Sequence, residues 1–298
     1  MEPSEVIGTI SELWRFPVKS MQGERLDQAI VGEAGILGDR AYAVIDRETG
    51  KVASAKHPKL WPELLSCRAT FSEPPRLGEK LPSVRLDLTD GTSVMSDADD
   101  VDAVLSRFFG REVKLAHSAP SDFTIDQYHP DIENLDPEGH RDEVTDTKLG
   151  AALFSQLGMA SLVPEGSFMD LFPVSVITTS TLDRLSELLP ESLLDIRRFR
   201  MNLFVDTAGA GFVENEWLGQ MIGVGSEVQL AVMLPDPRCV MTTAAQPGLP
   251  HDAAILRSLA KHNRLDVAGG GLYPCAGVYA AAVAGGTVCT ADPLRISA

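Results

Sequence analysis

The sequence has few cysteines, a deficit of basic residues and no long apolar segment. Its 298 residues include four cysteines without CxxC spacing, which indicates separate thiols and not a disulfide framework. Lysine and arginine total 26 against 42 acidic residues, and the formal net charge of −16 argues against general binding to nucleic acid or anionic membranes. No apolar run approaches the roughly 20 residues that span a bilayer. The first residues lack the basic and apolar regions of a signal peptide, so we expect a soluble, cytoplasmic protein.

Motifs for metals, nucleotides and nucleophilic hydrolysis are also missing. The six histidines form neither an HxH nor an HExxH pair, which gives a zinc site little support. The acidic run SDADDVD has Val101 where a calcium loop needs an oxygen ligand, so negative charge at a helix N-terminus explains it better. The segment GGGLYPCAG lacks the GxGxxG spacing of dinucleotide sites. No histidine or aspartate stands in a recognisable pairing motif for a cysteine hydrolase.

The residues that are present predict a mainly β protein with a few short helices (α+β). Apolar residues make up 44% of the chain, enough for the core of one large domain or two moderate ones. Turn residues at 48–50 and 90–91 predict two hairpins in the first third, and a helix that ends at Gly110 follows them. Many short strands with few helices predict a β-barrel or a β-sandwich.

The second half of the chain repeats this pattern after a polar interruption. FPVSVITTSTLDRLSELLP predicts a strand and then a helix capped by Thr179 or Ser180, and HDAAILRSLAKHN predicts an amphipathic helix. A hairpin is predicted to turn at residues 285–286. Residues 121–147 hold nine acidic side chains and one arginine, so we expect a solvated loop or connection there. A lid or substrate rim is the alternative.

One cysteine stands in an unusual setting, the segment MLPDPRCVMTT. Cys67 and Cys289 occupy strand-like surroundings typical of inert buried thiols, and Cys275 is ambiguous. Cys239 instead follows Arg238, whose charge favours the thiolate, the form that attacks electrophiles or binds soft metals. The hydroxyls after it could help to hold an anion. A structural cysteine remains the alternative explanation.

Basic side chains recur at intervals in this acidic chain. They stand in FPVKS, in GDRAY and in RRFRMN, each in or beside a strand-like segment: Lys19, Arg40, Arg197, Arg198 and Arg200. The planar guanidinium group of arginine suits phosphate or carboxylate. Any one of these residues alone is explained by surface salt bridges. Together with Cys239 they predict an anionic ligand held by several segments.

These segments, in this order and spacing, resemble the MOSC family, named for the C-terminal domain of molybdenum cofactor sulfurase. The likeness covers nearly the whole chain and includes LWRFPVKSMQGERLDQAIVGEAGILGDRAYAVID, FPVSVITTSTLDRL, RRFRMNLFVD, WLGQMIGVGSEVQL and PDPRCVMTT. It implies an N-terminal MOSC β-barrel domain over residues 1–118, an acidic connection over 119–150 and a MOSC β-barrel domain over 151–298.

The resemblance also implies a molybdenum cofactor, a molybdenum–pyranopterin that carries a phosphate. Cys239 matches the family's catalytic cysteine, which is the protein ligand of the metal. The implied cofactor contacts are Lys19, Ser20, Arg40, Arg200, Asn202, Arg238, Thr242 and Thr243. Residues 54–56 and 178–180 are weaker matches. Ser175, in PVSVIT, stands where many relatives have histidine, which puts the role of that histidine in doubt.

The activity implied is reduction of small N-hydroxylated or N-oxygenated substrates, without pyridoxal phosphate. Because the chain ends without an iron–sulfur domain, we expect a separate electron-donor protein of the ferredoxin, flavodoxin or cytochrome b5 type. Two alternatives stay open: a carrier or storage protein for the cofactor, and a sulfur carrier that holds a persulfide on Cys239.

Overall fold

The central feature of the fold is a sheet of seven strands that closes on itself. The structure, a computed structural model, describes residues 5–156 and 161–296. The strand order is β12-β13-β1-β19-β14-β15-β17, and β17 pairs back to β12, so this barrel has no free edge. The strands are β1 (Val6–Arg15), β12 (Val174–Thr178), β13 (Leu203–Asp206), β14 (Met221–Val224), β15 (Val228–Pro237), β17 (Leu272–Ala284) and β19 (Pro293–Ile296). The mainly β fold class is therefore confirmed.

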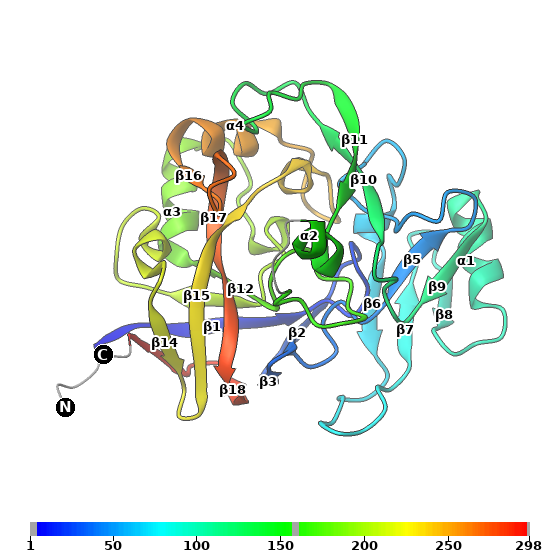
Figure 1. The fold of residues 1–298 in the computed structure, drawn as a ribbon, viewed down its shortest axis with the longest axis horizontal. Coiled ribbons are helices and arrows are strands. Elements are labelled where there is room, and N and C mark those ends of the chain that lie inside the picture. The colour runs from blue at the N-terminus through cyan, green and yellow to red at the C-terminus, as the bar shows by residue number, and fades with distance from the viewer. Residues whose placement is uncertain (1–4, 157–160, 297–298) are drawn as a thin grey trace.

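The first strand of the chain completes this barrel. β1 lies between β13 and β19 and pairs antiparallel with both, and in Figure 1 the blue strand lies among the yellow to red strands of the C-terminal half. Its inward side chains Ile10 and Leu13 belong to the barrel core with Val205, Val224 and Val278. The predicted domain limits stay a prediction, but the barrel of the C-terminal half is not built from that half alone.

Short sheets and one helix surround a second core in the N-terminal half. It contains Trp61, Leu64, Leu86 and Leu105. The elements here and at the rim of the barrel are β2 (Glu24–Leu26), β3 (Gln28–Gly32), β4 (Gly35–Ile36), β5 (Ala43–Asp46), β6 (Arg68–Phe71), β7 (Val84–Asp87), β8 (Ser93–Met95), α1 (Val101–Phe109), β9 (Val113–Ala116), β16 (Arg264–Asp266) and β18 (Gly286–Cys289). The hairpin predicted at residues 90–91 is confirmed by the pairing of β7 with β8. The predicted turn at 48–50 is closed by Asp46 N donating to Lys51 O at 3.0 Å.

The remaining helices are short and largely as predicted. They are α2 (Gly150–Gln156), α3 (Thr179–Leu188) and α4 (Ala253–His262), with 3-10 turns η1 (Leu64–Ser66), η2 (Ile196–Arg198), η3 (Val213–Trp217) and η4 (Val240–Thr243). The predicted cap of α3 was one residue late, because the Thr178 side chain accepts from Thr181 N at 3.2 Å. In the part of the chain that the structure describes, no helix is long and apolar enough to cross a membrane.

Two predictions about strands were wrong. The acidic segment is not an open loop, because β10 (Thr124–His129) and β11 (Glu143–Lys148) pair over six residues. Lys51 offsets part of the acidic charge of this hairpin by ion pairs to Asp126 at 2.6 Å and Asp146 at 3.3 Å. The hairpin predicted at 285–286 does not form either, since β17 pairs with β15 and β12 whereas β18 pairs with β3.

The barrel closure gives a stability prediction. Leu13→Ala removes a side chain with no exposed surface from β1 and should lower the free energy of unfolding by about 2–5 kcal/mol, the usual range for a buried leucine. Leu77→Ala, at a residue that is 72% exposed, is the control and should change it by less than about 0.5 kcal/mol. Urea unfolding followed by circular dichroism measures both values. Equal effects would contradict the role of β1 in the core.

Candidate functional site

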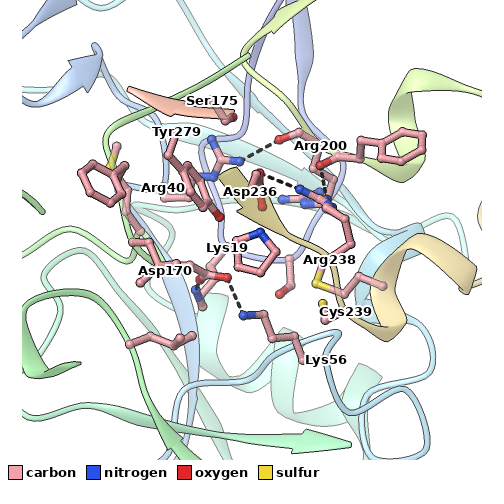
Figure 2. A pocket seen from close by; sticks show the side chains of 18 of the residues that line it. Lys19, Arg40, Lys56, Asp170, Ser175, Arg200, Asp236, Arg238, Cys239 and Tyr279 are labelled. Atoms are coloured by element: carbon pink, nitrogen blue, oxygen red, sulfur yellow. Dashed lines mark hydrogen bonds and ion pairs between the residues drawn. The ribbon is translucent and has the colours of Figure 1, made fainter. Parts of the chain in front are cut away.

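A cationic pocket lies where the barrel meets the N-terminal half. It brings together seven of the residues predicted from the sequence, from segments separated by up to 220 positions: Lys19, Ser20, Arg40, Arg200, Asn202, Arg238 and Cys239. Figure 2 shows the labelled cations and Cys239 around a common space. Lys56 and Ser54, the weaker matches, also line it. The cavity is about 120 Å³ in this conformation, below the roughly 300–1,000 Å³ of most small-molecule sites.

Three pocket residues adopt a backbone conformation that side chains normally avoid. The φ angles of Ser20, Arg40 and Arg200 are 65°, 47° and 57°, in the left-handed region. Such residues cost about 1–3 kcal/mol each and concentrate at functional sites. Seven non-glycine residues of the described chain have positive φ, and three of them line this one pocket. The clustering supports a functional role that is independent of the sequence resemblance.

An aromatic ring and a buried carboxylate hold the arginines in place. The guanidinium groups of Arg40 and Arg200 lie over the Phe16 ring, 4.6 Å and 4.4 Å from its centroid. Arg40 Nη2 donates to Arg200 O at 3.0 Å and Arg40 also pairs with Asp39. Burial lowers the pKa of Arg200 to about 9, and the neighbouring Arg40 charge acts in the same direction. An anion in the pocket would relieve this repulsion.

Asp170 neutralises the two lysines. Its carboxylate forms ion pairs with Lys19 and with Lys56, the latter at 2.8 Å (Figure 2). Burial would raise the pKa of Asp170, but the charges of Lys19 and Lys56 outweigh it and hold that pKa well below its ordinary value. Burial lowers the pKa of Lys19 against the opposing charge of Asp170. Asp170 thus supplies the negative charge that balances both lysines.

The cysteine lies at the end of β15, where η4 begins. Cys239 is half-buried on the pocket wall, and Arg238 beside it pairs with Asp236 at 2.6 Å. The turn is anchored from behind by Arg198, which is fully buried and donates to the carbonyls of Thr242, Ala244 and Pro250. The sequence singled out Arg198 as a possible ligand contact, whereas the structure uses it to support the cysteine turn.

Other predicted contacts do not reach the pocket. Thr242 and Thr243 are buried, and their hydroxyls donate to Cys239 O at 3.0 Å and Val240 O at 2.7 Å, so they close the turn and do not face an anion. The hydroxyl groups of residues 178–180 bond to Glu214, Asp206, Thr207 and Gly209 instead. Arg197 pairs with Asp195 at 2.7 Å near the surface. These predictions failed because the side chains point away from the pocket, and a sequence motif does not specify the direction of a side chain.

Three polar residues of the pocket were not predicted: Asp170, Asp236 and Tyr279. Asp236 precedes Arg238 by two residues, and strand alternation places the two on one face, which is the signal that could have found it. Burial raises the pKa of Asp236 to about 6, against the pull of Arg238. Burial likewise raises the pKa of Tyr279 well above its ordinary value, helped by the Asp236 charge. Both groups can therefore hold a proton at the pocket wall near neutral pH.

Ser175, at the position where the resemblance implies a histidine, has its hydrogen bonds satisfied within the chain. It is buried, its hydroxyl donates to Asn202 Oδ1 at 3.0 Å, and its backbone N donates to the same oxygen at 3.1 Å. Asn202 Nδ2 in turn donates to Asp39 Oδ2 at 3.0 Å. The serine therefore orients the asparagine and, through it, the carboxylate that faces Arg40.

Comparison with known proteins assigns the chain to a class. Residues 7–112 match the MOSC N-terminal beta barrel domain and residues 164–295 match the MOSC domain. The chain therefore belongs to the MOSC family, as its sequence segments and barrel fold indicated.

Two curated relatives match over most of their length. One is the mitochondrial amidoxime-reducing component 1 of Mus musculus, 23% identical over 97% of this chain and 82% of that protein. The other is the mitochondrial amidoxime reducing component 2 of Bos taurus, 25% identical over 97% of this chain and 83% of that protein. Among solved structures, the YUAD protein from Bacillus subtilis matches with a TM-score of 0.44 and 10% identity, over 97% of this chain and 94% of that one.

The Asp170 ion pairs give a prediction for stability against pH. Asp170→Asn leaves two lysines without their partner and should lower the free energy of unfolding at pH 7 by about 1.5–3 kcal/mol. Because the pKa of Asp170 is depressed, the wild-type advantage is complete above the unfolded value of about 3.9 and is lost progressively as the pH falls from there through the lower pKa of the folded state. Urea unfolding at several pH values should show the two proteins converging on acidification.

The matched control is Asp122→Asn, at an exposed aspartate. Its difference from wild type should stay small at every pH. A difference for Asp170→Asn that is independent of pH, or that grows on acidification, would contradict the assignment.

Proposed function

We propose that this protein is a molybdenum-cofactor-dependent oxidoreductase that reduces small N-hydroxylated or N-oxygenated molecules. The observation that carries the proposal is the pocket, in which a half-buried cysteine stands among five cationic side chains: Lys19, Lys56, Arg40, Arg200 and Arg238. A thiolate suits a soft redox metal, and the cations suit the phosphate of a pterin cofactor. The MOSC family membership and the names of the amidoxime-reducing relatives support the same class.

The donor set in the pocket fits such a cofactor. Arg238 Nε is buried and has no hydrogen-bond partner within the chain, so a polar atom of a ligand would satisfy it. Lys19, Lys56 and Arg40 would hold the phosphate, and Cys239 Sγ would bind the metal. The volume of about 120 Å³ is small for a pterin, so residues 169–172, which line one side, must shift outward and Asp170 must release the lysines.

When bound, the cofactor would supply the two-electron redox chemistry. Converting an N–OH group to N–H and water consumes two electrons and two protons. The electrons must come from a separate donor, for which the ferredoxin, flavodoxin or cytochrome b5 type remains a prediction. Asp236 is the candidate proton donor in the pocket. Its raised pKa of about 6 keeps a fraction of this carboxyl group protonated close to neutral pH. Arg238 would orient its carboxyl group.

Replacing the cysteine tests the proposal. Protein made in a host with intact molybdenum cofactor synthesis should contain close to one molybdenum per chain and reduce an amidoxime with an artificial electron donor. Cys239→Ala should lower the turnover rate by more than the roughly 10–100-fold typical of residues outside the direct ligands. Cys289→Ala, at another half-buried cysteine, is the control and should keep full activity.

The two alternative functions give different outcomes in the same experiment. Stoichiometric molybdenum without turnover on amidoximes and N-oxides would indicate a cofactor carrier. A mass increase of one sulfur on Cys239 after treatment with a cysteine desulfurase would indicate a sulfur carrier. Folded protein without molybdenum from the competent host would contradict the proposal itself.

A lysine substitution tests how the phosphate is held. Lys19→Gln removes a buried cation from the pocket and should lower the bound molybdenum and pterin by about 10-fold or more at equal protein concentration. Lys114→Gln, at an exposed lysine of β9, should leave both unchanged. Metal analysis and pterin fluorescence after denaturation measure the occupancy, and circular dichroism verifies the fold. Full occupancy in Lys19→Gln would remove Lys19 from the proposed contacts.

A further inference from the structure

A group of metal-ligating side chains lies outside the pocket, at the tip of the β10–β11 hairpin. His129 ends β10, and Asp136 and His140 lie in the loop that leads to β11. The imidazole and carboxylate atoms of these residues lie within 4.8 Å of one another. Figure 1 places the hairpin at the top of the view, beside α4 and apart from the barrel strands. No sequence motif predicted this group, because the spacing of its residues matches neither HxH nor HExxH.

Two distances between ligand atoms of this group are close to those found around a single ion. Asp136 Oδ2 lies 3.1 Å from His129 Nδ1, and Asp136 Oδ1 lies 3.3 Å from His140 Nδ1. Ligand atoms about 2.0–2.2 Å from a tetrahedral zinc ion are separated by roughly 3.3–3.5 Å, close to these values. Glu138 Oε2 lies 3.3 Å from His140 Nδ1, on a mostly exposed side chain that can turn inward.

The inner nitrogen atoms of both imidazoles face the Asp136 carboxylate, and the contact of His129 Nδ1 with Asp136 Oδ2 at 3.1 Å is a hydrogen bond that an ion would replace. His129 Nε2 lies 2.9 Å from Thr145 Oγ1, an outer contact of the kind that orients a metal-binding imidazole while the other nitrogen faces the ion. His140 Nδ1 is buried and forms no hydrogen bond of acceptable geometry, although carboxylate oxygens face it from two sides. A buried polar atom in this position lacks a partner that an ion would supply.

The loop is built to hold these residues in position. Asp136 Oδ1 accepts from Gly139 N at 2.7 Å and from His140 N at 3.2 Å, which fixes the turn between two of the ligands. Asn134 and Asp142 have positive φ values of 61° and 49° on either side of it. Ile132 and Leu135 pack against Leu256 and Ala260 of α4, so the loop is anchored on the helix. This anchoring reduces the conformational entropy that metal binding would otherwise cost.

We propose that His129, Asp136 and His140 form a structural site for a divalent transition metal of the zinc type. Two imidazole nitrogens with one carboxylate suit zinc or another first-row transition metal, whereas calcium and magnesium prefer sets of oxygen ligands. Glu138 or a water molecule supplies the fourth ligand. The same contacts without metal would be a hydrogen-bonded cluster that fixes the loop, and this is the competing explanation.

The site would act by fastening the hairpin onto the wall of the pocket. α4 begins beside the cysteine turn, where Asp252 N donates to Thr243 O at 2.8 Å. Near the tip of the hairpin, Tyr128 N, next to His129, donates to Lys56 O at 2.9 Å, and Lys56 lines the pocket. A metal at the tip would therefore make both of these neighbours of the pocket more rigid, without contact with substrate.

Zinc titration of the untagged full-length chain tests the proposal. Competition with a chromogenic zinc indicator should give one equivalent of zinc bound, and His140→Ala and Asp136→Asn should each weaken that binding by about 10-fold or more. His251→Ala, at an exposed histidine outside the group, is the matched control and should bind like wild type. Asp136→Asn keeps an oxygen that can accept from Gly139 N, so it separates the loss of the ligand charge from the loss of the turn.

Two further measurements keep the test decisive if a variant folds poorly. Cobalt in place of zinc should give tetrahedral absorption without the sulfur-to-metal charge-transfer band that Cys239 would produce. Zinc should slow hydrogen exchange at residues 130–142 of the wild type. Zinc binding that is lost in Cys239→Ser but kept in His140→Ala would overturn the proposal, as would wild type that binds no zinc.

Discussion

The pocket depends on carboxylates that balance its closely packed cations, two of them from neighbouring residues and one, Asp170, from a distant part of the chain. Lys19 and Lys56 share Asp170, Arg40 pairs with Asp39, and Arg238 pairs with Asp236. A buried cation without such a partner is costly, because desolvation in the protein interior is not repaid. The net charge of −16 says nothing about this local arrangement, in which the excess of acidic residues lies elsewhere and the pocket wall is cationic.

Barrel closure is what places these charges together. β1 joins β13 and β19, so the chain that leaves β1 at Phe16 passes the barrel rim and presents Lys19 and Ser20 opposite the end of β15. The positive φ angles at Ser20, Arg40 and Arg200 turn the backbone into the pocket at three points. The free-energy cost of these conformations is met by the packing of both cores around them. A substrate or cofactor in the pocket would therefore contact a rigid wall on the barrel side.

The opposite wall of the pocket does not belong to the barrel strands. It carries Asp170 on residues 169–172, between a short helix and β12, and its carboxylate is held by the two lysines that a phosphate would seek. The β10–β11 hairpin lies next to the same region through Tyr128 and Lys56, which connects its tip and the pocket by backbone hydrogen bonds.

Much of the architecture follows from local pattern. Alternation and turn residues predicted β7 and β8, helical spacing predicted α4 with Leu256 and Leu259 buried, and Gly110 ended α1 in the left-handed conformation. The residues around Cys239 and the recurring cations also predicted most of the pocket residues, because a charged residue in a strand-like segment can be recognised from the local sequence. Periodicity failed for β10 and β11, in which Asp126 and Asp146 pair with Lys51 from outside the hairpin.

The sequence by itself determined the fold class, the family and the set of cations around one cysteine. Tertiary structure alone decided that β1 closes the barrel, that Asp170 and Asp236 face the pocket, and that Thr242 and Thr243 turn away from it. It also decided that His129, Asp136 and His140 meet. The reason is physical: pairing partners, side-chain direction and desolvation depend on residues far apart in the chain, and no short motif records them.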